Sequence, residues 1–105
     1  MDNTVKTQFN MRERLIMCFY ECLGTSMLVL GYNFTNTGLA VCFNLFVGII
    51  ICNKTSGGMF NPAVTIAIYL TEGTFLKDLQ LILMIMCSQI FGGYLGIILA
   101  HICLG

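Results

Sequence analysis

The chain contains 105 residues, of which 57% are hydrophobic and only 10% are charged, and its five basic and five acidic side chains give a net charge of zero. Soluble domains carry about 25% charged residues, so this composition excludes a mostly water-exposed surface and predicts one that faces lipid or other helices. The neutral balance, without a basic patch, excludes nucleic acid as a partner.

The N-terminal residues 1–14 are polar and mixed in charge, and an apolar run follows over residues 15–32. This order resembles a secretory signal peptide. The apolar run is long for one, however, contains Glu21 and lacks a clear cleavage site. We therefore expect a short N-terminal segment over 1–14 and a retained membrane span over about 15–33.

Two further apolar runs are long enough to cross a bilayer, or nearly so. The first is somewhat short for the roughly 20 residues that a span requires, and flanking polar residues extend it to about 37–53. The second covers about 75–104 and is interrupted mainly by polar residues near its start. The chain is thus expected to be an all-α membrane protein with three transmembrane helices.

A different element lies between the second and third spans. Residues 53–58 (NKTSGG) are typical of a loop, and Asn61 followed by Pro62 is typical of a helix start. A helix ending near Leu70 would measure about 15 Å, half of the roughly 30 Å hydrocarbon core. We therefore predict a re-entrant loop and half-helix over 54–71, packed on protein or lining a water-filled cavity.

The basic residues predict the orientation of the chain in the membrane. With the three spans and the re-entrant turn, all five fall on one side: Lys6, Arg12, Arg14, Lys54 and Lys77. The positive-inside rule makes that side cytoplasmic. The N-terminus is therefore expected inside, in an integral, multi-pass membrane protein.

Asn61 is the central candidate for a pore function. At a helix N-terminus its side chain caps the helix and offers an amide donor, and the helix dipole leaves partial positive charge there. Near the membrane midplane such an end orients water oxygens and disfavours cations. The alternative is a plain N-cap, which Asn often provides. A half-length helix in a membrane protein favours a pore function for Asn61, Pro62 and Ala63.

The four residues before this tripeptide, Gly57, Gly58, Met59 and Phe60, are expected to have an irregular backbone. Their carbonyl groups cannot all be bonded within a helix and can form a row of acceptors along a pore. The alternative is a tight loop that requires the flexibility of glycine. We favour the pore.

Two polar residues lie deep within the predicted spans. Glu21 is costly there, and it can carry protons, bind a cation or accept hydrogen bonds from loop N–H groups near 55–58. Apart from Asp78 at the start of the third span, the spans contain no second carboxylate, so we favour the structural alternative. Gln89 is expected to form an interhelical hydrogen bond, and Gly92 and Gly96 form a G-x-x-x-G motif that allows close helix packing.

Catalysis and cofactor binding are not expected. The sequence contains no nucleophile–base pair, phosphate-binding loop or cluster of metal ligands. The six cysteines lie within apolar runs without a C-x-x-C pair and are expected to be small buried hydrophobes. The chain is therefore not expected to be an enzyme, and neither a metal nor a cofactor is predicted.

Together these residues resemble the aquaporin, or major intrinsic protein, family. Residues 56–65 (SGGMFNPAVT) are similar to its first signature loop, residues 21–25 (ECLGT) to its first-helix pattern, and Gln89-x-x-Gly92 to its third. The resemblance implies an aquaporin-like half-repeat, with three spans and one half-helix, of a six-span channel for water or small neutral solutes. It also implies a homotetramer and a supporting role for Glu21.

Two positions bear on the solute. Val41, twenty residues before Asn61, looks like the second-helix position of the family's outer constriction, which is usually aromatic in strict water channels. Valine there implies a wider filter and larger solutes such as glycerol or urea. Met59 stands where the family often has histidine.

The sequence holds one Asn-Pro-Ala and three predicted spans, whereas the family has two half-helices and six spans. We therefore expect the N-terminal half of a channel, an interpretation that the apolar ending Leu104-Gly105 favours. The alternative is a natural half-protein that acts as a non-conducting interaction or structural subunit. A pore made of two inverted copies is disfavoured by the one-sided charge.

Overall fold

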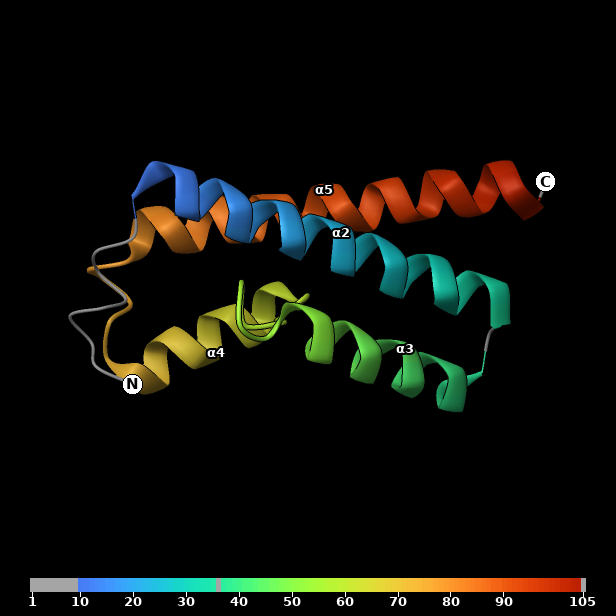
Figure 1. Ribbon diagram of the computed structural model, residues 1–105, viewed down its shortest axis with the longest axis horizontal. Coiled ribbons are helices and arrows are strands. Elements are labelled where there is room, and N and C mark those ends of the chain that lie inside the picture. Colours follow the sequence, from blue (N-terminus) through green and yellow to red (C-terminus); the bar gives the residue numbers. More distant parts are fainter. Residues whose placement is uncertain (1–9, 36, 105) are drawn as a thin grey trace.

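The computed structural model describes residues 10–35 and 37–104. This part of the chain is all-helical, and its four helices are α2 (Met11–Thr35), α3 (Gly38–Cys52), α4 (Pro62–Glu72) and α5 (Leu79–Leu104). They form two layers (Figure 1): α2 and α5 run side by side in one direction, and α3 and α4 follow one another in the other direction. Lys6, one of the basic residues that predict the orientation, and Gly105 at the C-terminus lie outside the described residues.

Helix starts and ends follow from local polar chemistry. The side-chain oxygens of Asn10, Thr37 and Asn61 accept hydrogen bonds from backbone N–H groups in the first turns of α2, α3 and α4. Pro62 occupies the first position of α4, where no intrahelical N–H bond is lost. Gly73 ends α4 in the left-handed conformation, with a φ of 74°.

Helix lengths separate the elements into two classes. α2 has 25 residues and α5 has 26, and at 1.5 Å per residue each measures about 38 Å. In length and composition these two of the described helices are sufficient to cross a membrane. α3 has 15 residues, about 22 Å, which is shorter than the roughly 30 Å hydrocarbon core.

The long helices start close together. Arg14 near the start of α2 donates to the side-chain oxygen of Gln80 near the start of α5, at 3.2 Å. α2 begins four residues before the predicted span 15–33, and α5 begins four residues after residue 75. The later start arises because residues 74–78 form a turn, in which the Asp78 N–H bonds to the Thr74 carbonyl.

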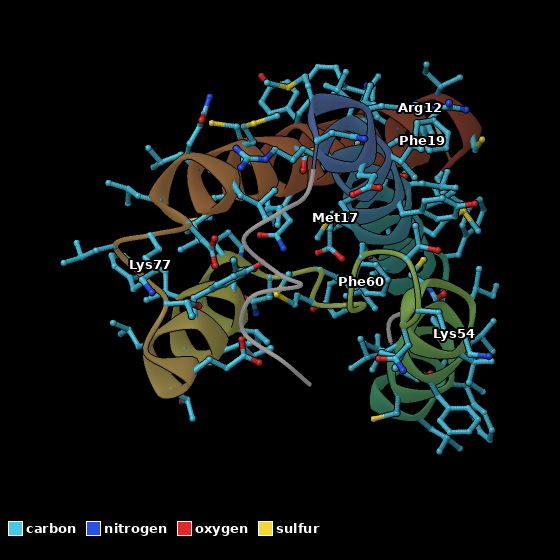
Figure 2. All side chains as sticks on the ribbon, turned by 60° about the vertical axis from the view of Figure 1, so that its left-hand side comes forward. Arg12, Met17, Phe19, Lys54, Phe60 and Lys77 are labelled. Carbon is cyan, nitrogen blue, oxygen red and sulfur yellow. The ribbon has the colours of Figure 1, made fainter. Side chains whose placement is uncertain are left out.

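A small apolar core joins α2, α4 and α5. Its buried members are Met17, Met59, Tyr69, Leu81, Ile82 and Ile85. Figure 2 shows Met17 pointing inward from α2 and Phe19 pointing outward from the same helix. Many large apolar side chains of α3 and α5 remain exposed on this chain, as expected where lipid or further helices cover them.

The cysteines differ in part from the expectation of burial. All six are free, and Cys52 alone among them is fully buried in the described chain, while Cys18 and Cys22 are half-buried. Burial is wrong for Cys42, Cys87 and Cys103, which are exposed. Their apolar surroundings in the sequence do not distinguish a helix face turned toward other helices from one turned outward.

Candidate functional site

The loop between α3 and α4 reverses the chain within a few residues. The N–H groups of Thr55, Ser56 and Gly57 all point to the carbonyl of Cys52, at 3.0, 2.8 and 3.2 Å. The chain then takes left-handed φ angles of 94° at Gly57, 63° at Gly58 and 55° at Phe60. Glycine adopts such angles without strain, whereas for Phe60 they are unfavourable.

Glu21 of α2 accepts hydrogen bonds from three loop residues. One carboxylate oxygen accepts from the Ser56 hydroxyl at 2.6 Å and from the Met59 N–H at 3.2 Å, and the other accepts from the Phe60 N–H at 2.8 Å. Glu21 is completely buried. A buried carboxylate is costly unless donors surround it, and two of these donors are the backbone N–H groups of Met59 and Phe60, which lie outside any helix.

Gln89 of α5 extends this network to the half-helix. Its amide nitrogen donates to Glu21 at 2.7 Å and to the Thr65 hydroxyl at 2.9 Å. The Thr65 hydroxyl in turn donates to the Asn61 carbonyl at 3.1 Å. Glu21, Gln89 and Thr65 are all buried. One buried hydrogen-bond network therefore connects α2, α5 and the start of α4.

These bonds place the loop near the middle of the long helices. Glu21 lies ten residues beyond the start of α2 and Gln89 ten residues beyond the start of α5, so each is about 15 Å along its helix. The start of α4 accordingly lies near the middle of the long dimension, and α4 runs toward the end where α2 begins (Figure 1).

Asn61 is an exposed residue at the tip of the half-helix. Its side-chain oxygen accepts from the Ala63 N–H at 2.8 Å, so its NH₂ group is the end that remains for another partner. Asn61 and Ala63 are exposed, and Pro62 between them is half-buried. The helix dipole adds partial positive charge at the same point.

The other predicted pore residues divide by exposure. Gly57 is exposed, whereas Gly58, Met59 and Phe60 are buried, with the Met59 side chain in the core and the Phe60 ring between α2 and α3. Any contact of Met59 or Phe60 with a solute therefore uses the backbone. Val41 is half-buried in the first turn of α3, at the opposite end of that helix from the loop.

Thr65 and Ser56 are the members of this site that sequence reasoning did not single out as polar partners. Thr65 is four residues beyond Asn61, the spacing at which a helical threonine reaches a backbone carbonyl. Ser56 lies in the signature-like loop but offers no pattern of its own. Within the described residues, no group of three or more His, Cys, Asp or Glu side chains is placed to hold a metal ion.

The chain matches the family model described as Major intrinsic protein over residues 6–104. It is 40% identical over 96 residues to Aquaporin-8 of Rattus norvegicus, and 38% identical over 96 residues to Aquaporin-8 of Mus musculus and of Notomys alexis. Each alignment covers 81% of this chain but only 35% or 36% of the relative, so the chain spans about one third of their length. No solved structure matches it significantly. Since the family model covers nearly the whole sequence, this chain belongs to the major intrinsic protein family of membrane channels.

Proposed function

We propose that this chain forms one half of the pore of a membrane channel for water and small neutral solutes. The observation that carries the proposal is the exposed Asn61 tip of a half-length helix, held halfway along α2 and α5 by the buried Glu21. Irregular backbone at membrane depth is stable only where protein packs on it or water reaches it. Here Glu21 packs one side of the loop, and the tip remains open on the other.

The chemistry at this tip suits a neutral solute that accepts hydrogen bonds. The Asn61 NH₂ group donates to the oxygen of a passing water or hydroxyl, and the dipole of α4 repels cations. Backbone carbonyls of residues 57–60 serve as acceptors before the tip. Glu21 and Gln89 support this arrangement and do not contact the solute, because both side chains are buried in the network.

In the membrane, we infer three spans over about 15–33, 37–53 and 75–104, with the re-entrant segment over 54–71. Three of the four described basic residues support a cytoplasmic N-terminus, since Arg12, Arg14 and Lys77 lie at the end where α2 and α5 begin, while Lys54 lies in the loop after α3. The family architecture supports completion of the pore by a second half-helix and assembly of four such pores into a homotetramer in the bilayer.

Val41 bears on which solutes pass. A valine at a constriction occupies less volume than an aromatic ring, which supports a filter wide enough for glycerol or urea as well as water. The solute series is therefore part of the test: water, glycerol and urea compared in the same vesicles.

The decisive experiment is a swelling assay on vesicles that contain the complete protein. We expect permeability to water or glycerol clearly above that of empty vesicles. Permeability equal to that of empty vesicles, with correctly inserted protein, would overturn the channel and favour a non-conducting subunit of the same fold.

A single substitution tests the tip itself. Asn61→Asp keeps a side-chain oxygen that caps α4 but removes the NH₂ donor and adds negative charge, so solute permeability should fall and exclusion of cations should weaken. Asn53→Asp is the matched control, because Asn53 is also exposed but follows α3 at the other side of the loop. If the two variants had the same solute permeability and the same cation exclusion, Asn61 would have no function in the pore.

A further inference from the structure

Three features of Phe60 set it apart from the other residues of the loop. It is a non-glycine residue with a φ of 55°, its side chain is 4% exposed, and it directly precedes Asn61. A left-handed conformation is unfavourable for a bulky residue. The surrounding structure must therefore hold Phe60 in place through contacts that outweigh this cost.

The ring lies in a slot formed by two glycines on different helices. A Cβ atom at Gly24 of α2 would collide with the Cδ1–Cε1 edge of the ring, and one at Gly48 of α3 would lie 2.8 Å from Cε2 on the opposite edge. Figure 2 shows Phe60 between these helices. Because both edges are in contact, the ring acts as a spacer that fixes how closely α2 and α3 approach.

The same residue is fixed through its backbone. The Phe60 N–H donates to Glu21 at 2.8 Å, so the ring and the amide hold the residue from two directions. Asn61 is the next residue, and the direction of its side chain depends on where Phe60 is held. The ring also borders a cavity of about 100 Å³ between α2 and α3, lined mainly by apolar side chains of both helices, into which a displaced ring can move.

We propose that Phe60 is a positioning residue whose ring, seated between Gly24 and Gly48, sets the spacing of α2 and α3 and the placement of Asn61, and so tunes which solutes the pore admits. This inference rests on the proposed channel function. The side chain of Phe60 does not contact the solute. It affects selectivity through the position in which it holds Asn61.

The test is a double-mutant cycle read as the ratio of water to glycerol permeability in vesicles of the complete protein. Gly48→Ala pushes the ring out of its slot and should change this ratio about fivefold, in keeping with the coupling of contacting residues. In the double variant Gly48→Ala, Phe60→Leu, the smaller side chain leaves room for the new methyl group. The ratio should then return to within about twofold of the wild-type value.

Gly93→Ala is the matched control, because a Cβ there would meet its neighbours at an ordinary 3.9 Å. It should leave the ratio unchanged. An equal loss of both permeabilities in Gly48→Ala, or independent effects of the two substitutions, would overturn the positioning role, since a merely structural residue changes the amount of folded protein and not the ratio.

Failure of the channel function is distinguishable from failure of this inference. If the wild-type protein does not conduct, the proposed function is wrong and the link to selectivity is wrong with it. If the wild-type protein conducts and the ratio is unchanged in Gly48→Ala, the channel stands and the positioning role of Phe60 is wrong.

Discussion

The two sides of α2 use glycine in different ways. On the side of α5, added Cβ atoms at Gly92 and Gly96 would collide with backbone carbonyls of α2, so the two helices are in backbone contact there. On the side of α3, Gly24 and Gly48 instead leave room for the ring of Phe60. On the same side Gly31 leaves room for the Asn44 side chain of α3. Glycine thus allows backbone contact at one interface and makes room for side chains at the other, one of them from the loop.

The two sides also differ in what holds them together. In lipid, apolar side chains gain little by packing against one another, so close backbone contact and buried hydrogen bonds carry more of the stability. The α2–α5 interface combines close backbone contact with the Gln89–Glu21 and Arg14–Gln80 hydrogen bonds. The loop beside α3 depends on the buried carboxylate of Glu21 and its donors. Substitutions that remove one feature at a time measure how far the two sides depend on each other.

The largest effect is expected at Glu21. Glu21→Gln keeps the shape but offers one acceptor oxygen in place of two and turns an NH₂ group toward loop donors. The free energy of unfolding should fall by about 3 kcal/mol, since buried donors lose a charged acceptor. Thermal denaturation in detergent measures this, and hydrogen exchange at the Met59 and Phe60 amides should accelerate.

Glu13→Gln provides the control for this substitution. Glu13 is exposed in the first turn of α2, where loss of charge should cost less than about 1 kcal/mol. Similar melting temperatures for the two variants would contradict a supporting function of Glu21 in the loop.

A somewhat smaller effect is expected on the opposite side of α2. Gly92→Ala places a methyl group against the carbonyl of Cys22, and backbone cannot yield as a side chain does, so α2 and α5 must separate. The expected loss is about 2 kcal/mol. The adjacent Gly93→Ala has ordinary 3.9 Å contacts and should be neutral or slightly stabilising. If Gly92→Ala and Gly93→Ala had the same melting temperature, the stability of the α2–α5 interface would not depend on backbone contact.

These two sides also differ in how far sequence alone predicts them. α4 begins at Pro62, where the Asn-Pro pair places it, and ends at Glu72, two residues beyond the predicted Leu70. The Gly92 and Gly96 pair is visible because both residues lie on one helix at a spacing of four. Such features depend on neighbours in the chain, and local chemistry determines them.

The loop contacts depend on the tertiary arrangement instead. Glu21 was expected to accept from N–H groups near residues 55–58, but the backbone donors are Met59 and Phe60. Which side of the loop faces α2 depends on the left-handed turns, and nothing in the sequence predicts one at Phe60. The slot for its ring cannot be recognised in the sequence either, because Gly24 and Gly48 lie on different helices.

A third substitution tests the link from this network to the half-helix. Thr65→Val keeps the side-chain shape but removes the hydroxyl that joins Gln89 to the Asn61 carbonyl. The expected loss is about 1 kcal/mol, because the Thr65 hydroxyl and the Gln89 amide that donates to it are both buried. Thr71→Val is the control: its hydroxyl bonds to the Ala67 carbonyl on an exposed face of α4. Equal denaturation midpoints for Thr65→Val and Thr71→Val would show that the stabilising hydrogen-bond network ends at Gln89.

The smallest effect is expected at a hydrogen bond that directly joins α2 and α3. The Asn44 amide donates to the Met27 carbonyl at 2.8 Å, and Asn44→Ala should cost about 0.6 kcal/mol, as is usual for such bonds in membranes. Asn33→Ala is the control, since the Asn33 amide bonds within α2, to Val29. If Asn44→Ala destabilised the protein more than Gly92→Ala, the hydrogen bond would hold the α2–α3 interface. The small loss expected here instead leaves the spacing of these helices to the ring of Phe60.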